Sequence, residues 1–376
     1  MRSFFHTCKH LIGAALLLGV PACDWIHDDS LPPCEFRLHY VYDYNMKFAD
    51  AFRHEVNQVS LFICDQDGNF LSQRLIEGAE LKTNDIRLDL EPGTYQLLSW
   101  AGLREDSYAW PELTPGQSTL RDIRVRARRA DDGTQPHELS PLWHSLDTVR
   151  ISGTSHEEQT IGLNKNTNKL RLVLQNVKGE NMDVNDFTFR IVADNGYMDY
   201  DNSLLADPAV TYLPYYTENV EIAADPDPAA TVTDQLVAVA EMNTLRLMAG
   251  KNYRLIVRHK AFEEDVLNIN LKGCFNMVRH VTPYINLNNY LLLTKMEGHD
   301  ISAQEYLDRQ DEYSVIFFLT PVECPDCPPV DPVDPVDPVD PVDPVDPDEP
   351  DIPIIGYKCF VIQVNDWVIR LNDFDL

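Results

Sequence analysis

The reactive side chains at the most telling spacing in this chain are Cys324 and Cys327, which flank a Pro-Asp pair. A Cys-x-x-Cys pair can form a redox-active disulfide or supply half of a zinc site. The redox motif needs a βαβ setting and the zinc site needs a second ligand pair, and the surrounding sequence offers neither. We therefore expect a local disulfide between Cys324 and Cys327, or two free thiols, and no metal.

Other residue patterns that catalysis would need are missing or incomplete. His54-Glu55 lacks the second histidine of a zinc-protease helix, and the sequence holds no Gly-x-Ser-x-Gly elbow and no phosphate-binding loop. His137, His144 and His156 lie near one another around Trp143, but loop and core positions are the ordinary explanation for such histidines. The sequence therefore predicts no enzyme and no cofactor.

Two acidic segments have some of the residues of a calcium loop. They are Asp65–Asn69 and Asp194–Asn202, and both lack a bidentate glutamate at the right spacing. We expect hairpin turns at both positions instead.

Cys23 ends a segment whose layout points to lipid attachment. A basic start is followed by an almost wholly apolar stretch, Leu11–Val20, and then by Val20-Pro21-Ala22 just before the cysteine. About ten apolar residues cannot span a bilayer of roughly 30 Å, so a removed secretory signal is expected over residues 1–22. The segment resembles the lipobox of bacterial lipoproteins, which implies acyl chains such as palmitate on Cys23. An ordinary secreted protein cut near Cys23 is the alternative.

Residues 23–34 form an acidic tether that includes Asp24, Asp28 and Asp29 and then Pro32-Pro33. The proline pair disfavours a helix and favours an extended chain. An acidic stretch after a lipidated cysteine resembles the surface-export signal of Bacteroidetes lipoproteins, and a plain solvated leader is the alternative. The predicted location is the outer membrane, lipid-anchored and exposed at the surface.

Composition excludes one class of partner. The 376 residues carry a formal net charge of −29, which repels phosphate backbones and argues against nucleic-acid binding. The hydrophobic content of 44% is enough for packed cores without disulfides. We therefore expect no shared disulfide framework among the six cysteines that follow Cys23, namely Cys34, Cys64, Cys274, Cys324, Cys327 and Cys359.

Residues 323–353 form a Pro/Asp-rich linker in which Pro-Val-Asp triplets repeat. Proline at every third position removes backbone donors, so neither helix nor sheet is expected. In polyproline II, Pro328 to Pro353 would extend on the order of 80 Å at about 3.1 Å per residue. We interpret the segment as a passive spacer.

The spacer is followed by two strand-like runs, 357–364 and 367–371, joined by Asn365-Asp366. A lone hairpin is marginal in water, so residues 354–376 need a sheet to join. The hairpin either completes a sheet of its own chain, which we favour, or is donated to another protein. The candidate contact residues on these strands are Phe360, Ile362, Val364, Trp367, Ile369 and Leu371.

Between residues 35 and 322 the sequence reads as all-β. Short alternating strands with frequent turns predict sandwiches, with short helices at 45–54 and 302–309. The polar run Asn164–Lys169 is the best candidate for a domain boundary. We predict an N-terminal β-sandwich over 35–166 and a C-terminal one over 167–322. Strands are expected at 36–42, 56–64, 70–71, 86–90, 95–100, 160–163, 170–174, 187–192, 231–239, 245–247, 253–257 and 315–319.

Several stretches resemble the FimB/Mfa2 family of fimbrial anchor lipoproteins from Bacteroidales. They include Tyr42–Phe52, Leu61–Gly68, Leu90–Gly102, Leu163–Asn168, Asp194–Asn202, Tyr306–Leu319 and Val364–Asp373. The Pro-Val-Asp repeat departs from the family pattern. The resemblance implies two transthyretin-like β-sandwich domains in tandem. It also implies a protein that ties the fimbrial shaft, through its fimbrillin subunit, to the outer membrane and limits shaft length.

A second function class is a surface lipoprotein that binds glycans or another nutrient. Its binding face would present exposed aromatic side chains such as Trp100, Trp110 and Trp143. The anchor predicts a β-sandwich protein partner, whereas the glycan-binding protein predicts an aromatic platform on an open face.

Overall fold

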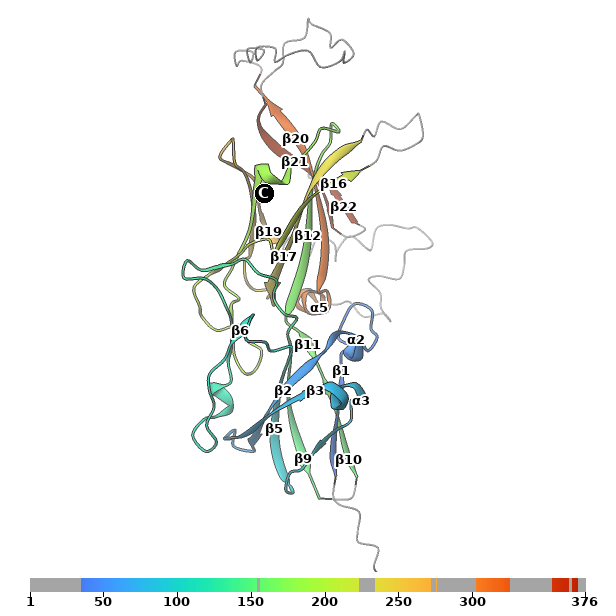
Figure 1. Cartoon of the computed structure of the whole chain (residues 1–376), viewed down its shortest axis with the longest axis vertical. Helices are drawn as coiled ribbons and strands as arrows, with labels where there is room; N and C mark the ends of the chain where they lie inside the picture. Colours follow the sequence, from blue (N-terminus) through green and yellow to red (C-terminus); the bar gives the residue numbers. More distant parts are fainter. Residues whose placement is uncertain are drawn as a thin grey trace, which may run out of the picture.

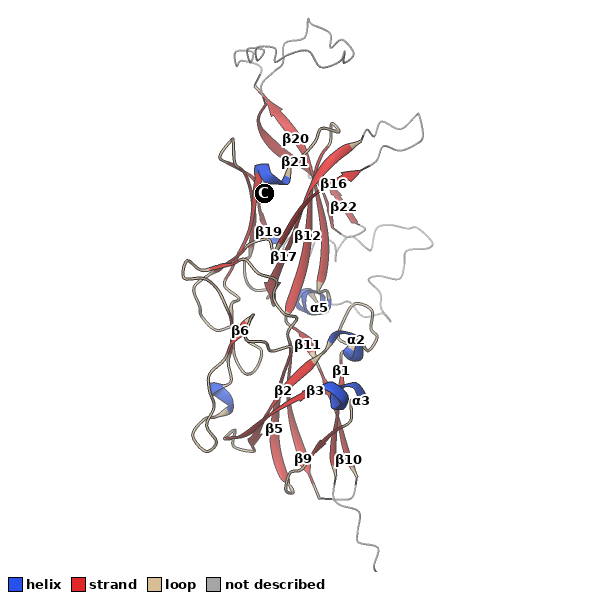
Figure 2. Ribbon diagram, viewed as in Figure 1, coloured by secondary structure: helices blue, strands red, loops and turns tan. Residues whose placement is uncertain are grey.

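The computed structural model describes residues 35–153, 156–222, 234–271, 275, 302–324, 354–364 and 367–370. Two pairs of facing sheets follow each other along the long axis of the molecule (Figure 1). Strands dominate and the helices are short (Figure 2), so the predicted all-β class and sandwich architecture are confirmed. In the described part of the chain, no helix is both long and apolar enough to span a bilayer.

The N-terminal pair consists of a three-stranded sheet, β10-β1-β4, and a five-stranded sheet, β11-β9-β5-β2-β3. Apolar side chains of both sheets, among them Leu38, Leu61 and Ile161, form one core between them. The strands are β1 (Phe36–Val41), β2 (Gln58–Asp65), β3 (Phe70–Glu77), β4 (Ile86–Leu88), β5 (Gly93–Ala101), β9 (Trp143–Ile151), β10 (Glu157–Gly162) and β11 (Asn164–Lys165).

The C-terminal pair consists of a six-stranded sheet, β16-β17-β12-β20-β21-β22, and a five-stranded sheet, β19-β18-β13-β15-β8. The six-stranded sheet contains β12 (Thr167–Asn176), β16 (Tyr216–Ile222), β17 (Gln235–Leu245), β20 (Glu312–Glu323), β21 (Ile354–Val364) and β22 (Trp367–Arg370). The facing sheet contains β8 (Thr134–Gln135), β13 (Phe187–Ala193), β15 (Val210–Tyr212), β18 (Arg254–His259) and β19 (Glu264–Asn270).

The long segment 103–142 covers the outer face of the five-stranded N-terminal sheet. It contributes to a third small sheet, β14-β7-β6, formed by β6 (Tyr108–Ala109), β7 (Val125–Ala127) and β14 (Tyr197–Met198). The short helices of the chain are α2 (Phe52–Glu55), α3 (Gly78–Thr83), α5 (Ala303–Arg309), and the 3₁₀ turns η1 (Leu120–Asp122) and η2 (Val184–Asp186).

Alternation of side chains explains the central strands. In β12, Leu170, Leu172 and Leu174 point into the core while the residues between them are exposed or half-buried. β20 alternates in the same way, with Val315 and Phe317 buried. The side-chain period of two fixes which face of each strand is inside, and a one-residue slip would expose the whole apolar set.

Most predicted strands are present, but β9 was not predicted. His144, Ser145, Asp147 and Thr148 give β9 a polar sequence, although its first three residues are buried. The helix expected at 45–54 is wrong in extent, because α2 begins only at Phe52. The helix expected at 302–309 is confirmed by α5, which the Ser302 hydroxyl caps by accepting from the Glu305 amide.

Sheet membership changes at the polar run Asn164–Lys169: β11 pairs with β9, and β12 pairs with β17 and β20. However, β7 and β8 precede this point and pair with β14 and β15, which follow it. The division into 35–166 and 167–322 therefore stays a prediction.

The C-terminal strands lie in the six-stranded sheet of their own chain. β21 runs antiparallel to β20, with Glu323 opposite Ile354 and Val315 opposite Val364, and β22 follows as the edge strand. The two described residues that flank the Pro-Val-Asp segment thus lie near each other on neighbouring strands. The segment joins two adjacent strand ends, so its length is not needed to reach a distant sheet.

Candidate functional site: the waist and the sheet edges

Most of the predicted lipidation and strand-contact residues do not fall on described side chains. Cys23, Cys327 and Leu371 lie outside the described residues, as do the side chains of Phe360, Val364, Trp367 and Ile369. Ile362 is fully buried in the core, so a partner cannot contact it while β21 stays in this sheet.

The cysteines give a mixed result. Cys64 is a buried free thiol. Cys324, which directly follows β20, is disulfide-bonded. Cys327, the partner predicted for it, is outside the described residues, so that pairing stays a prediction.

Two edges of the six-stranded sheet are candidate contact surfaces. β22 is the last strand on one side, and β16 is the last on the other. Tyr216, at the start of β16, is 44% exposed. Edge strands present unpaired backbone groups that can accept a strand from another protein.

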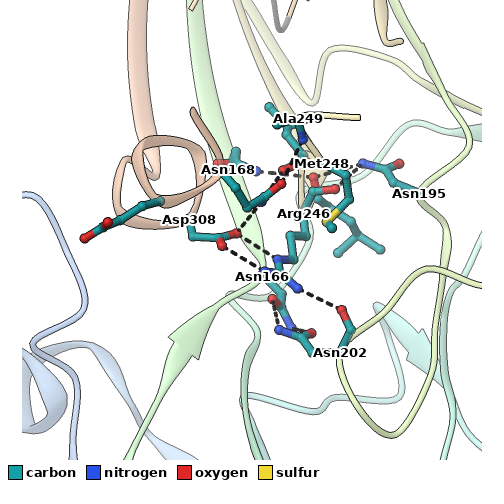
Figure 3. Close-up of polar contacts among 12 residues, drawn as sticks. Asn166, Asn168, Asn195, Asn202, Arg246, Met248, Ala249 and Asp308 are labelled. Atoms are coloured by element: carbon teal, nitrogen blue, oxygen red, sulfur yellow. Dashed lines mark hydrogen bonds and ion pairs between the residues drawn. The ribbon is translucent and has the colours of Figure 1, made fainter. Parts of the chain in front are cut away.

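A buried polar network holds the waist of the molecule, where the N-terminal and C-terminal pairs of sheets meet (Figure 3). We call Asn166, Asn195, Asn202, Arg246 and Asp308 the waist network. Arg246 forms a bidentate ion pair with Asp308, its Nε and Nη2 each 2.8 Å from a carboxylate oxygen. The third guanidinium nitrogen donates to the Asn202 carbonyl at 2.8 Å. Both charged side chains are largely buried, so the pair is shielded from water.

Three asparagines complete the waist network. The Asn166 and Asn202 amides donate to each other's side-chain oxygens, at 2.7 and 3.2 Å. Asn195 is fully buried and donates to the Thr244 hydroxyl and the Leu245 carbonyl, while the Tyr212 hydroxyl donates to its amide oxygen. The stretch Asp194–Asn202 therefore binds other parts of the chain, and its Met198–Leu204 bridge fits the predicted turn.

Lys165 makes a second connection across the waist. Its ammonium group pairs with Glu55 at the end of α2 and with Asp311 just before β20, and it lies 5.3 Å from the centre of the Trp143 ring. Burial would lower the pKa of Lys165, but the carboxylates of Asp311 and Glu55 outweigh it and raise that pKa. The charge is therefore kept, and it joins segments from both pairs of sheets.

Sequence reasoning located the waist network only in part. The asparagine-rich runs at 164–169 and 194–202 were visible, but Arg246 and Asp308 were not singled out. They are separated by 62 positions, so only the fold brings them together.

The aromatic platform expected for glycan binding is wrong for two of its three members. Trp100 is fully buried beneath the 103–142 segment, whereas Trp143, which is 1% exposed, is buried in the core between the two N-terminal sheets. Trp110 is half-buried and packs against the core cluster. The three histidines around Trp143 do not meet either: in the described residues, no group of three metal-ligating side chains comes together.

His144 is buried beside Trp100, with ring centres 4.7 Å apart, and its Nε2–H donates to the Tyr200 carbonyl at 2.8 Å. Burial lowers the pKa of His144 to about 4, and the nearby Arg246 acts in the same direction. The folded protein therefore keeps His144 neutral at pH values where the unfolded chain would protonate it.

Acidification is therefore expected to destabilise the protein through His144. Neutral His144 makes its full contribution to the free energy of unfolding above pH 6.5, the pKa of histidine in the unfolded chain. That contribution is lost progressively as the pH falls toward 4, the pKa of His144 in the folded protein. Between pH 7.5 and pH 5 the expected loss is about 2 kcal/mol of unfolding free energy. Urea unfolding at both pH values measures it.

The variant His144→Gln should lose about 2 kcal/mol less than the wild type over the same pH interval. The same change at the exposed His137, His137→Gln, is the matched control for loss of an imidazole ring outside the buried site. Equal slopes for wild type and His144→Gln would contradict the assignment.

One comparison with known proteins identifies a family. The model of the fimbrillin-A associated anchor proteins Mfa1 and Mfa2 matches residues 31–373. No curated protein matches the chain.

Three solved structures are similar over nearly the full length. A Bacteroides thetaiotaomicron protein provisionally described as polysaccharide-binding is 32% identical, with 90% of this chain and 99% of that chain covered and a TM-score of 0.68. A second protein of that organism, provisionally described as an adhesin, is 28% identical, with 92% and 100% covered and a TM-score of 0.69. The fimbrial anchor protein Mfa2 from Porphyromonas gingivalis shares the fold at 15% identity, with 90% and 99% covered and a TM-score of 0.58.

Proposed function

Because the chain belongs to the family of fimbrillin-A associated anchor proteins Mfa1 and Mfa2, we propose that it is a fimbrial anchor subunit. It ties the fimbrial shaft to the outer membrane and limits the length of the shaft. The observation that carries the proposal is the family match over residues 31–373, which is nearly the whole chain. The role is structural and includes no catalytic step and no cofactor.

The start of β1 and the C-terminal strands lie at opposite ends of the molecule, which suits a protein that is held at one end and binds a partner at the other. β1 begins at one end of the long axis, whereas β20 ends and β21 begins at the other (Figure 1). Cys23 precedes Glu35 by only twelve positions, so an acylated Cys23 would hold the β1 end near the membrane. The six-stranded sheet would then point away from the membrane, with β16 and β22 open to a shaft subunit.

The contacts to the shaft subunit are proposed for the C-terminal strands, at Phe360, Val364, Trp367, Ile369 and Leu371. The described pairing of β21 with β20 supports an intact sheet whose edge, β22, takes up a partner strand. Donation of the whole hairpin to the shaft is the competing arrangement, and it would expose Ile362 and the core beneath it.

A pull-down from detergent-solubilised outer membrane tests the anchor function. A fimbrial shaft subunit is expected to co-purify with the full chain. A chain without residues 354–376 separates the two arrangements, since loss of β21 should lower the melting temperature if the hairpin belongs to its own sheet. Absence of any fimbrial subunit from the pull-down of an intact, folded chain would refute the anchor proposal.

Lipidation of Cys23 is tested separately. Cys23→Ala is expected to release the protein from the membrane fraction or to leave an uncleaved precursor, because two or three acyl chains give firm anchoring where one is marginal. Mass spectrometry of the mature wild-type protein should find acyl chains on Cys23. An unmodified Cys23 in that mature protein would be incompatible with this mode of attachment.

A further inference from the structure

A groove of about 430 Å³ lies on the outer face of the five-stranded N-terminal sheet. The 103–142 segment covers most of this face and buries Phe62 and Leu98 completely. The cover stops short of β3, where Leu75 is 52% exposed. The groove is lined by Gln58, Ser60, Gln73, Leu75, Leu103, Arg104, Glu105, Asp106 and Trp110.

The floor of the groove is polar. Ser60 is only 3% exposed and lines the groove. Gln58 donates through its amide nitrogen to the Leu103 carbonyl at 2.6 Å, which leaves its amide oxygen for a ligand. Gln73 is exposed, and its side-chain amide likewise has no partner among the residues that the structure describes. These side chains present donors and acceptors to the groove, so a ligand that can hydrogen-bond fits it.

The opposite wall combines an aromatic ring with charged side chains. Trp110 is fixed from behind by the core cluster. Arg104 and Asp106 form an ion pair of 3.2 Å, and each is more than half exposed. Arg104 and Asp106 also line a second hollow of about 290 Å³. The two hollows together could take a ligand several units long.

The lining fits a carbohydrate better than a peptide. Sugar hydroxyls both donate and accept, and planar amide, carboxylate and guanidinium groups offer paired atoms to them. An aromatic ring supplies the apolar surface for the C–H face of a sugar. Six of the nine lining residues are polar. Strand addition along β3 is already blocked at Phe70, whose backbone bonds to Ser118 and Gly116.

We propose that this groove is a binding site for neutral oligosaccharides, with Trp110, Gln73, Gln58 and Ser60 as the contact residues. The ligand is neutral because Glu105 and Asp106 outnumber Arg104 in the lining, and the whole chain carries −29. The acidic lining and the negative net charge of the chain both repel acidic glycans. The site is separate from the edges assigned to the shaft subunit, so the anchor would also have an adhesive function.

Calorimetric titration of the full mature chain in detergent tests the proposal. The probes are mannohexaose, maltohexaose, hexagalacturonate and a peptide of residues 354–376. At least one neutral hexasaccharide should bind, and hexagalacturonate should not. Trp110→Ala and Gln73→Ala should each weaken that binding by about 10-fold or more. Tyr216→Ala, an exposed aromatic on β16, is the matched control and should bind as the wild type does.

Failure of both neutral probes to bind at about 10 mM would overturn the proposal, as would equal binding of hexagalacturonate. Wild-type affinity in Gln73→Ala would also overturn it, and this exposed position keeps the test valid if Trp110→Ala does not fold. Binding of the peptide alone would assign the groove to a protein strand. The pull-down of a fimbrial subunit should be unaffected in both groove variants, so loss of glycan binding leaves the anchor proposal intact.

Discussion

Replacing Gly102 by alanine is expected to destabilise the N-terminal pair of sheets by more than about 4 kcal/mol, in the range of the most severe point mutations. Gly102 directly follows β5 at φ +73°, and a Cβ there would collide with the Pro141 carbonyl oxygen. That oxygen belongs to the backbone just before β9, so it cannot move away cheaply. The Gly102 amide also donates to the Gln58 carbonyl at 3.0 Å, which fixes its position.

Gly116 provides the matched control. It has nearly the same backbone conformation, φ +75°, but no atom lies within 4 Å of the position that a Cβ would take there. Gly116→Ala therefore measures only the cost of a left-handed alanine, about 1–2 kcal/mol. Urea unfolding of both variants isolates the clash at Gly102. A difference below about 1 kcal/mol between them would show that the Pro141 backbone yields easily.

The second large effect is expected at the waist. Arg246→Met should cost about 3–5 kcal/mol of unfolding free energy, because it leaves the buried Asp308 carboxylate without its bidentate partner. The double variant Arg246→Met/Asp308→Leu should regain most of that loss, since replacing both charges by apolar groups removes the unpaired charge.

Lys169 and Glu138 form the matched surface pair. Their ion pair is 2.8 Å long, but the side chains are 47% and 51% exposed. Removing Lys169 should therefore cost less than about 1 kcal/mol. If Arg246→Met is as mild as this control, the waist pair contributes little and the two pairs of sheets are held by packing alone.

Two strands, β12 and β9, show which parts of the fold could be predicted from the sequence. β12 was predictable because Leu170, Leu172 and Leu174 alternate with polar residues along one strand. β9 was not predictable, because His144 and Ser145 are polar residues in buried positions. The alternation of apolar and polar residues along a strand cannot reveal burial that other segments create. The alternation of apolar residues can be recognised within one strand, whereas burial by the 103–142 segment depends on how distant parts of the chain fold together.

The same limit explains the errors at the tryptophans. Trp100 and Trp143 look alike in the sequence as candidates for an exposed platform. Trp100 is buried beneath the 103–142 segment, whereas Trp143 is buried in the core between the two N-terminal sheets. Trp110 differs only because it lies within the covering segment itself. The groove beside it depends on where that segment ends over β3, which no local pattern encodes.

The family resemblance carried more information than the periodicity did. The stretch Leu90–Gly102 was noted for its sequence, and the structure supplies the physical reason for its last residue, since only glycine fits at position 102. The stretch Asp194–Asn202 likewise contains Asn195 and Asn202, whose amides bridge strands far apart in the chain. A single sequence could mark such segments but could not give their partners.

The neighbouring ends at Glu323 and Ile354 have a consequence for how this gene can change. The Pro-Val-Asp triplets are identical units, so triplets can be added or removed without changing either flanking strand. Because the flanking strands are paired with each other, a change in copy number leaves the ladder between β20 and β21 in register. Even for a fully flexible connection, doubling its length costs only about 0.6 kcal/mol. Strains that differ in the number of triplets would therefore share one folded body, and the same position would accept an inserted epitope tag.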